Sequence, residues 1–307
     1  MNKKVEALTA VSMWLLMSLY GAARVLQILP GKLPLVAVVS LHVLPLLLFA
    51  VIHGAMSYGS RGILIFFAIC LVVGNAFENL GVATGFPFGR YYFTDAMGPK
   101  LFQVPILLGL AYVGMGYLSW TLGRIILGNL RSPPLGARVI TLPLVAAFPM
   151  VAWDFANDPV WANINHLWVW QRGGAYFGVP LTNFLGWYLV VYLIYQSFAI
   201  YLRGWAFNAT AKTSGYWRWA VIFYALAAVG DIIIVLPKPD PAVVFDSVGR
   251  PWNVTAITSA CALVSMFAMG AFAVIAAVRL LDEPRETAEA GDQQLAHSAR
   301  DRPNEKR

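Results

Sequence analysis

Polar side chains suited to proton transfer interrupt several long apolar stretches of the sequence. Asp154 and Asp158 are four residues apart, so a helix that continues through both would place them on one face. Two carboxylates held close together tend to share one proton, and such a pair can act as a general acid near neutral pH. The alternative is a structural role, in which Pro159 marks a helix end and Asp154 bonds to a neighbouring helix. Three further candidates lie in other apolar stretches: Glu78, Asn183 and Asp231.

The composition indicates the solvent that surrounds these stretches. Of 307 residues, 59% are hydrophobic and 12% are charged, and the mean hydropathy is +0.65. Soluble globular proteins have about 25% charged residues, so this chain lacks the polar surface that a soluble domain of its size needs. The formal net charge is +7. The basic residues fall between apolar runs, which favours lipid headgroups as their partners and argues against nucleic acid.

The apolar runs are long enough to cross a membrane as helices. A span needs roughly 20 apolar residues, and the sequence predicts an all-α, polytopic transmembrane bundle of about eight such helices. Seven spans are the alternative count, and the weakest run is the one that Pro143 and Pro149 interrupt. The predicted runs are 6–29, 34–57, 62–84, 102–127, 137–157, 180–202, 217–236 and 254–280.

The distribution of basic residues predicts the orientation of this bundle. With a cytoplasmic N-terminus, 15 of the 22 lysines and arginines fall in inside segments and 7 in outside segments, which agrees with the positive-inside rule. Both termini are then cytoplasmic, and the chain is a multi-pass protein of the cell membrane. We expect a transmembrane domain over 1–281 and a charged, disordered cytoplasmic tail over 282–307. In this topology the polar candidates all lie toward the outer face.

Two segments between predicted spans differ from ordinary loops. The first, 77–95, combines Glu78 with glycines and aromatic residues, and its Arg90 could pair with Glu78 or Asp95. The second, 163–187, is rich in tryptophan and ends with Asn183 inside the next span. The aromatic residues suit either a belt at the membrane surface or the wall of a pocket for an apolar ligand. A buried amide such as Asn183 needs a hydrogen-bond partner.

Several kinds of site are not indicated by the sequence. Its two cysteines lie inside apolar runs and form no CxxC pair, and its four histidines form none of the clusters that membrane di-iron enzymes need. His42 and His53 lie in one predicted span, and we expect both to be structural. The sequence also contains no dinucleotide-binding GxGxxG after a strand, no P-loop and no GxSxG motif. We therefore expect no metal and no cofactor.

Three motifs together resemble the membrane-integral carotenoid 1′,2′-hydratases of bacteria and archaea, which include the γ-carotene and lycopene hydratases and bisanhydrobacterioruberin hydratase. They are FENLGVATGFPFGRYYFTD at 77–95, WDFANDP at 153–159 and WVWQRGGAYFGVPLTNFLGW at 168–187. The resemblance covers most of the spans and excludes the tail after about 282. It implies a carotenoid biosynthesis enzyme, a hydro-lyase that adds water to the terminal C1′=C2′ bond of a linear carotene end group without a cofactor. The implied partners are a carotenoid from the bilayer, water, and a downstream carotenoid glycosyltransferase or desaturase.

This chemistry needs an acid that protonates the alkene, a group that stabilises the tertiary carbocation, and one positioned water. As a hypothesis, Asp154 or Asp158 donates the proton, while Glu78 orients water or stabilises the cation. Asp231 is a secondary candidate. Residues expected to position water or flank the polyene are Asn183, Tyr92, Asn157, Arg90, Trp153, Phe155, Tyr91 and Trp187.

Two other functions would use similar residues. A carotenoid cyclase also protonates an end group, but its cation closes on an internal double bond, so product mass distinguishes it from a hydratase. A membrane prenyltransferase fits less well, because it needs two Asp-rich clusters for Mg²⁺ and only 154–158 resembles one. A non-catalytic transporter or lipid-binding protein could use buried carboxylates for proton coupling. It would be recognised by substrate movement that depends on a proton gradient.

Overall fold

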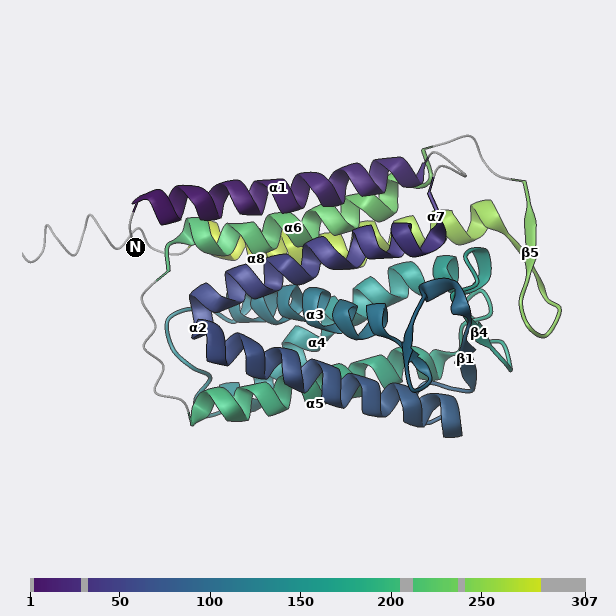
Figure 1. Cartoon of the computed structure of the whole chain (residues 1–307), viewed down its shortest axis with the longest axis horizontal. Helices are drawn as coiled ribbons and strands as arrows, with labels where there is room; N and C mark the ends of the chain where they lie inside the picture. Colours follow the sequence, from purple (N-terminus) through teal and green to yellow (C-terminus); the bar gives the residue numbers. More distant parts are fainter. Residues whose placement is uncertain (1–2, 29–32, 205–211, 237–240, 283–307) are drawn as a thin grey trace, which may run out of the picture.

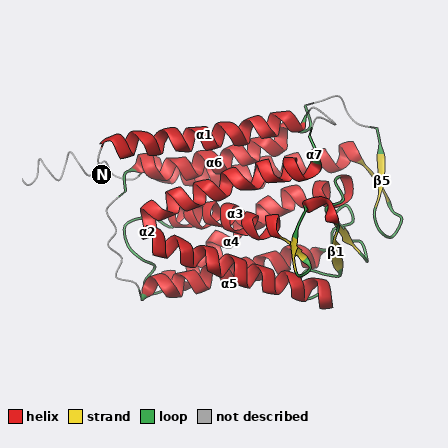
Figure 2. Ribbon diagram, viewed as in Figure 1, coloured by secondary structure: helices red, strands yellow, loops and turns green. Residues whose placement is uncertain are grey.

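The computed structural model describes residues 3–28, 33–204, 212–236 and 241–282, so the predicted tail lies outside the described residues except for Asp282. The described chain is a bundle of long helices with short strands at one end, as Figures 1 and 2 show. Its helices are α1 (Lys3–Gln27), α2 (Leu35–Thr84), η1 (Asp95–Met97), α3 (Ile106–Ile126), α4 (Arg138–Pro159), η2 (Val160–Ile164), α5 (Leu181–Arg203), α6 (Ser214–Ile233), α7 (Val254–Val264), η3 (Ser265–Met269) and α8 (Gly270–Leu281). Its strands are β1 (Tyr91–Phe93), β2 (Lys100–Leu101), β3 (Val104–Pro105), β4 (Trp168–Trp170), β5 (Val243–Phe245) and β6 (Pro251–Asn253).

The expected number of membrane crossings agrees with these helices. Within the described ranges, seven helices are long and apolar enough to cross a membrane. One of them, α2, has 50 residues and contains a non-helical residue, Gly59, with φ of +68°. Glycine adopts this conformation without the steric cost that a side chain adds. The chain reverses direction there (Figure 1), and each half of α2 is long enough for a crossing of its own. Counted in this way, the seven helices agree with the expected eight crossings.

Large apolar side chains on the outside of the bundle mark the surface that faces lipid. Leu15, Leu64, Val72 and Phe267 are each at least 65% exposed. A soluble protein rarely exposes so much contiguous apolar surface, whereas hydrocarbon solvates it well. The helices satisfy their own backbone groups, which is what a chain in hydrocarbon requires. The prediction of an all-α membrane protein is therefore confirmed.

The core of the bundle surrounds α3, the most buried of the spans. This helix packs against α2, α4, α6 and α8. Its large side chains Tyr112, Tyr117 and Trp120 are almost completely buried. Helix α1 and the α7–α8 segment are more peripheral. Side chains of α3 therefore reach any site that forms between α2, α4 and α5.

The two ends of the bundle differ in structure. One end contains the turn at Gly59, the start of α1 and the end of α8, where Arg279 lies against Gly128. The described helices therefore begin and end on the same side, as an even number of crossings requires. All the described strands lie at the other end (Figure 2). That this strand-bearing end faces outward is the prediction from the charge distribution.

The two unusual segments pair with each other at the strand-bearing end. Strands β1 and β4 are antiparallel, with Tyr91 opposite Trp170 and Phe93 opposite Trp168. Residues directly opposite one another lie on the same face of such a ribbon. The ribbon therefore turns an aromatic face toward the ends of α2 and α4, where the carboxylates lie.

Candidate active site

Asp154 and Asp158 lie on one face of α4, because the helix continues through both residues and a π-helical turn follows at Val160–Ile164. The α4 helix ends at Pro159, but the π-helical turn continues the span to Ile164. Asp154 contacts a neighbouring helix through Asn183 of α5, as the structural alternative predicts. Both carboxylates point to Asn183, near the start of α5. The Asn183 amide nitrogen donates to Asp158 Oδ2 at 2.5 Å and to Asp154 Oδ2 at 3.0 Å. All three side chains are buried.

Asp158 accepts two more hydrogen bonds from the ribbon. The indole nitrogens of Trp168 and Trp170 lie 2.8 and 3.2 Å from its Oδ1 atom. The tryptophan indole can only donate, so Asp158 Oδ1 is the acceptor in both hydrogen bonds. With Asn183 included, three described donors hold the Asp158 side chain in one orientation.

Glu78 faces the same region from the second half of α2 and accepts two phenol hydrogen bonds. The Tyr112 hydroxyl of α3 donates to its Oε1 at 2.7 Å, and the Tyr91 hydroxyl of β1 donates to its Oε2. Burial and the neighbouring Glu78 carboxylate raise the pKa of Tyr91 well above its usual value, so this phenol stays a neutral donor. Among the described residues, no lysine or arginine forms a salt bridge with Glu78, Asp154 or Asp158.

A small cavity, here called the acidic cavity, lies between Glu78 and Asp158. Its volume open to the centre of a water molecule is about 20 Å³, which is room for one water. It is lined by Glu78, Phe88, Tyr91, Phe93, Leu108, Asp158, Trp168, Trp170, Asn183 and Trp187. Polar groups from α2, α4 and α5 thus face one water-sized space that aromatic rings enclose.

A second and larger cavity, here called the apolar cavity, adjoins the acidic cavity. Its volume is about 50 Å³ by the same measure. It is lined by Tyr20, Val39, His42, Val43, Leu46, Met97, Leu108, Ala111, Trp153, Asn157, Trp161, Leu167 and Trp168. Leu108 and Trp168 line both cavities, so the two cavities meet at these side chains.

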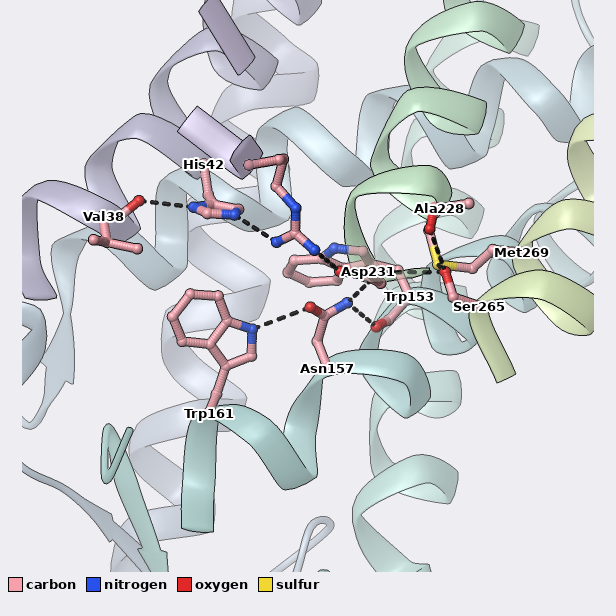
Figure 3. A network of polar contacts seen from close by, with 10 residues as sticks. Val38, His42, Trp153, Asn157, Trp161, Ala228, Asp231, Ser265 and Met269 are labelled. Carbon is pink, nitrogen blue, oxygen red and sulfur yellow. Dashed lines mark hydrogen bonds and ion pairs between the residues drawn. The ribbon is translucent and has the colours of Figure 1, made fainter. Parts of the chain in front are cut away.

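Asp231 belongs to a different cluster from the other acids (Figure 3). It forms a buried ion pair with Arg24 of α1 and accepts a hydrogen bond from the Asn157 side chain at 3.1 Å. Arg24 Nη1 lies 2.5 Å from His42 Nε2. Because arginine only donates, His42 Nε2 is the acceptor, and its Nδ1 carries the hydrogen that bonds to the Val38 carbonyl oxygen. The group of Arg24, His42, Asn157 and Asp231, here called the Arg24 cluster, therefore contains a cation and an anion. The ionisable groups of the acidic cluster (Glu78, Asp154 and Asp158) are all carboxyl groups.

Comparison with known families identifies the group to which this chain belongs. Residues 34–244 match the model of the family described as carotenoid biosynthesis protein, and this match covers more than half of the chain. The chain is a member of the carotenoid biosynthesis protein family. This carotenoid biosynthesis match includes Glu78, Asp154, Asp158 and Asn183, but it excludes Arg24. Comparison with curated proteins and with solved structures finds no match.

The structure brings most of the sequence-predicted residues of this carotenoid biosynthesis protein to the two cavities. Trp187 lines the acidic cavity and stacks on Tyr112 with ring centroids 4.6 Å apart. Trp153 and Asn157 line the apolar cavity. Asp154 lies behind Asn183 and is not among the residues that line either cavity. Phe155 packs in a separate aromatic cluster with Tyr176 and Phe184.

Two predicted positions need correction. Tyr92 is 46% exposed, because side chains alternate along β1 and its neighbours Tyr91 and Phe93 take the buried face. Arg90 is exposed and lines an outer hollow, so it pairs with neither expected partner. Asp95 instead pairs with Lys100 at 2.7 Å, and this hydrogen bond lowers the pKa of Asp95. Glu78 bonds to the two phenols.

Several residues of these clusters were not predicted from the sequence. Tyr112 carries no signal in the sequence, because it is one of 13 tyrosines in an apolar chain. For Trp168 and Trp170 the sequence left a membrane-surface belt and a pocket wall open, and it did not indicate that both donate to Asp158. Arg24 was not singled out from the sequence, although a lone arginine in one apolar run is a candidate partner for a lone aspartate in another.

Proposed function

We propose that this protein adds water to the terminal C1′=C2′ double bond of a linear carotene end group. The observation that carries the proposal is the pair of adjoining cavities. One has room for a single water between Glu78 and Asp158, and the other is apolar and larger. Hydration of a polyene needs one water in an otherwise dry, apolar site. The family supports carotenoid biosynthesis as the setting.

The proton comes from the acidic cluster. Three buried carboxyl groups, with no salt-bridged cation among the described residues, would be very costly to hold fully ionised. The cluster therefore holds protons. Asp158 accepts three hydrogen bonds and Glu78 accepts two, so Asp158 is the better suited of the two to be the anion and Glu78 is the better proton donor. Asp154 acts through Asn183, as a positioning residue.

The proposed reaction has two steps. Glu78 transfers its proton to C2′, the π bond breaks, and a tertiary carbocation forms at C1′. The water oxygen then bonds to C1′ and gives one proton to the Asp158 carboxylate, and transfer within the cluster returns a proton to Glu78. The sum is alkene plus water giving a tertiary alcohol. The Trp168, Trp170 and Trp187 rings around the acidic cavity are suited to stabilise the cation.

A water-sized space between acids favours hydration over cyclisation, because a cyclase must keep water away from the same cation. Expression in a bacterial host that makes lycopene, followed by mass analysis of the pigments, tests the proposal. We expect a pigment heavier by one water. A host that makes a fifty-carbon precursor belongs in the same experiment, because chain-length preference could hide activity on lycopene. Pigments of unchanged mass in both hosts, with the protein present in the membrane, would contradict the proposal.

A further inference from the structure

The Arg24 cluster contains hydrogen-bonding groups that the protein itself does not satisfy. Arg24 is 2% exposed, and its Nη1 and Nη2 atoms contact His42 and Asp231. Its Nε atom is buried and has no partner among the described residues. The Oε1 atom of Gln27, one turn further along α1, is also buried without a described partner. Leaving a buried donor and a buried acceptor unpaired is costly, so such atoms usually have an unseen partner.

Both atoms belong to residues that line one small cavity, here called the Arg24 cavity. Its volume open to the centre of a water molecule is about 20 Å³, which is room for one oxygen atom with its hydrogen. Asn157 and Asp231 also line it. A hydroxyl group suits this space, because a single oxygen can accept from Arg24 Nε and donate to Gln27 Oε1.

The Arg24 cavity adjoins the apolar cavity. Asn157 and Trp161 line both, and the Trp161 indole donates to Asn157 Oδ1 at 3.2 Å. Figure 3 shows Trp161, Asn157 and Asp231 connected in this order by hydrogen bonds. The apolar cavity therefore meets the acidic cavity at Trp168 and the Arg24 cavity at Asn157 and Trp161.

We propose that the Arg24 cavity binds the alcohol oxygen of a polyene end group that occupies the apolar cavity. This inference rests on the proposed function, because hydration would place a tertiary alcohol on that end group. The alcohol product then has a polar site away from the acids that could dehydrate it again. The unreacted hydrocarbon has no group to place there, so the protein binds the alcohol more tightly than the hydrocarbon.

Equilibrium binding tests this pocket separately from catalysis. The full-length protein in detergent is titrated with two polyenes of equal length, and binding is followed by quenching of tryptophan fluorescence. One polyene ends in a tertiary alcohol. The other has the saturated 1′,2′-dihydro end group, which cannot be hydrated. We expect the wild-type protein to bind the alcohol roughly 10-fold more tightly, as one or two hydrogen bonds to a charged network would give.

Gln27→Met keeps the length of the side chain and removes its acceptor. We expect this variant to bind the alcohol and the saturated polyene with about equal affinity. Gln103→Met is the matched control, because Gln103 is exposed in the β2–β3 turn; it should keep the preference. Equal binding of the two polyenes by the wild-type protein would show that the cavity holds only water and would overturn the proposal. A preference that survives Gln27→Met would do the same. A clear preference in a protein that hydrates no carotene would refute the reaction and leave the pocket standing.

Discussion

Asp154 and Asp158 share one hydrogen-bond donor, the side-chain amide of Asn183, but only Asp158 has further described donors. The two carboxylates look equivalent in the sequence, since they are four residues apart on one helical face. The β1–β4 ribbon makes them different. It brings the indoles of Trp168 and Trp170 to Asp158, which lines the acidic cavity, and leaves Asp154 behind Asn183.

This difference predicts unequal effects of amide substitutions. Asp158→Asn removes the proton acceptor. Whichever way the new amide is turned, its NH₂ group faces a donor, either the Trp168 and Trp170 indoles or the Asn183 amide. We expect hydration to fall at least about 100-fold, the usual scale of a lost acid–base group. Asp154→Asn should lower it only about 10-fold, because Asp154 positions Asn183. The measurement is the yield of hydrated pigment per amount of membrane protein. Equal activity in the two variants would contradict the assignment.

Tyr91 and Tyr92 are neighbours with opposite environments, which makes them a matched pair. Tyr91→Phe removes a hydrogen bond to Glu78 without changing the shape of the ring, and we expect a roughly 10-fold loss of activity. Tyr92→Phe removes an exposed hydroxyl and should leave activity within about two-fold. Activities of both variants are compared in the same lycopene-producing host. A larger loss in Tyr92→Phe than in Tyr91→Phe would show that the strand faces are assigned incorrectly.

Gly81 permits the close approach of β1 and α2. A Cβ atom added there would lie 2.7 Å from Phe88 Cδ2 and 3.0 Å from the Tyr91 hydroxyl. Gly81→Ala must displace both rings, and we expect about 1–3 kcal/mol of destabilisation together with lower activity. Gly21→Ala is the control, because its added carbon would lie 3.8 Å from Leu226, an ordinary contact. Thermal unfolding in detergent measures both, and equal stability of the two variants would refute the close contact.

The Arg24–Asp231 pair predicts a non-additive pattern of stability. Either single substitution to leucine leaves one buried charge without its partner, which costs about 3–5 kcal/mol. The double substitution removes both charges, so we expect the double variant to be more stable than either single variant. A complete cycle of thermal unfolding midpoints tests this coupling. Additive losses would mean that the two charges do not depend on each other.

The helices could be predicted because a span in hydrocarbon leaves a long and nearly uninterrupted apolar signal. The predicted break between 57 and 62 agrees with the turn at Gly59, and the run 254–280 agrees with α7, η3 and α8. The short strands carry no comparable signal. Residues 102–105 looked like the start of a span, but Val104 and Pro105 form β3.

The site was harder to predict than the fold, because it depends on the pairing of distant segments. The placement of Tyr91 rather than Tyr92 toward Glu78 follows from the register of β1 on β4, and a shift by one residue would exchange their faces. Nothing local in the sequence fixes that register. The same pairing brings the indoles of Trp168 and Trp170 to Asp158, which decides between the membrane-surface belt and the pocket wall that the sequence left open.

In the proposed reaction, the water in the acidic cavity becomes the oxygen of the product. Membranes that contain the protein, incubated with lycopene and with a fifty-carbon carotene in oxygen-18-labelled water, test it most directly by mass analysis of the pigments. We expect a tertiary alcohol that carries one labelled oxygen, formed by the wild-type protein and not by Glu78→Gln. Carotenes of unchanged mass, or an alcohol without the label, would contradict it.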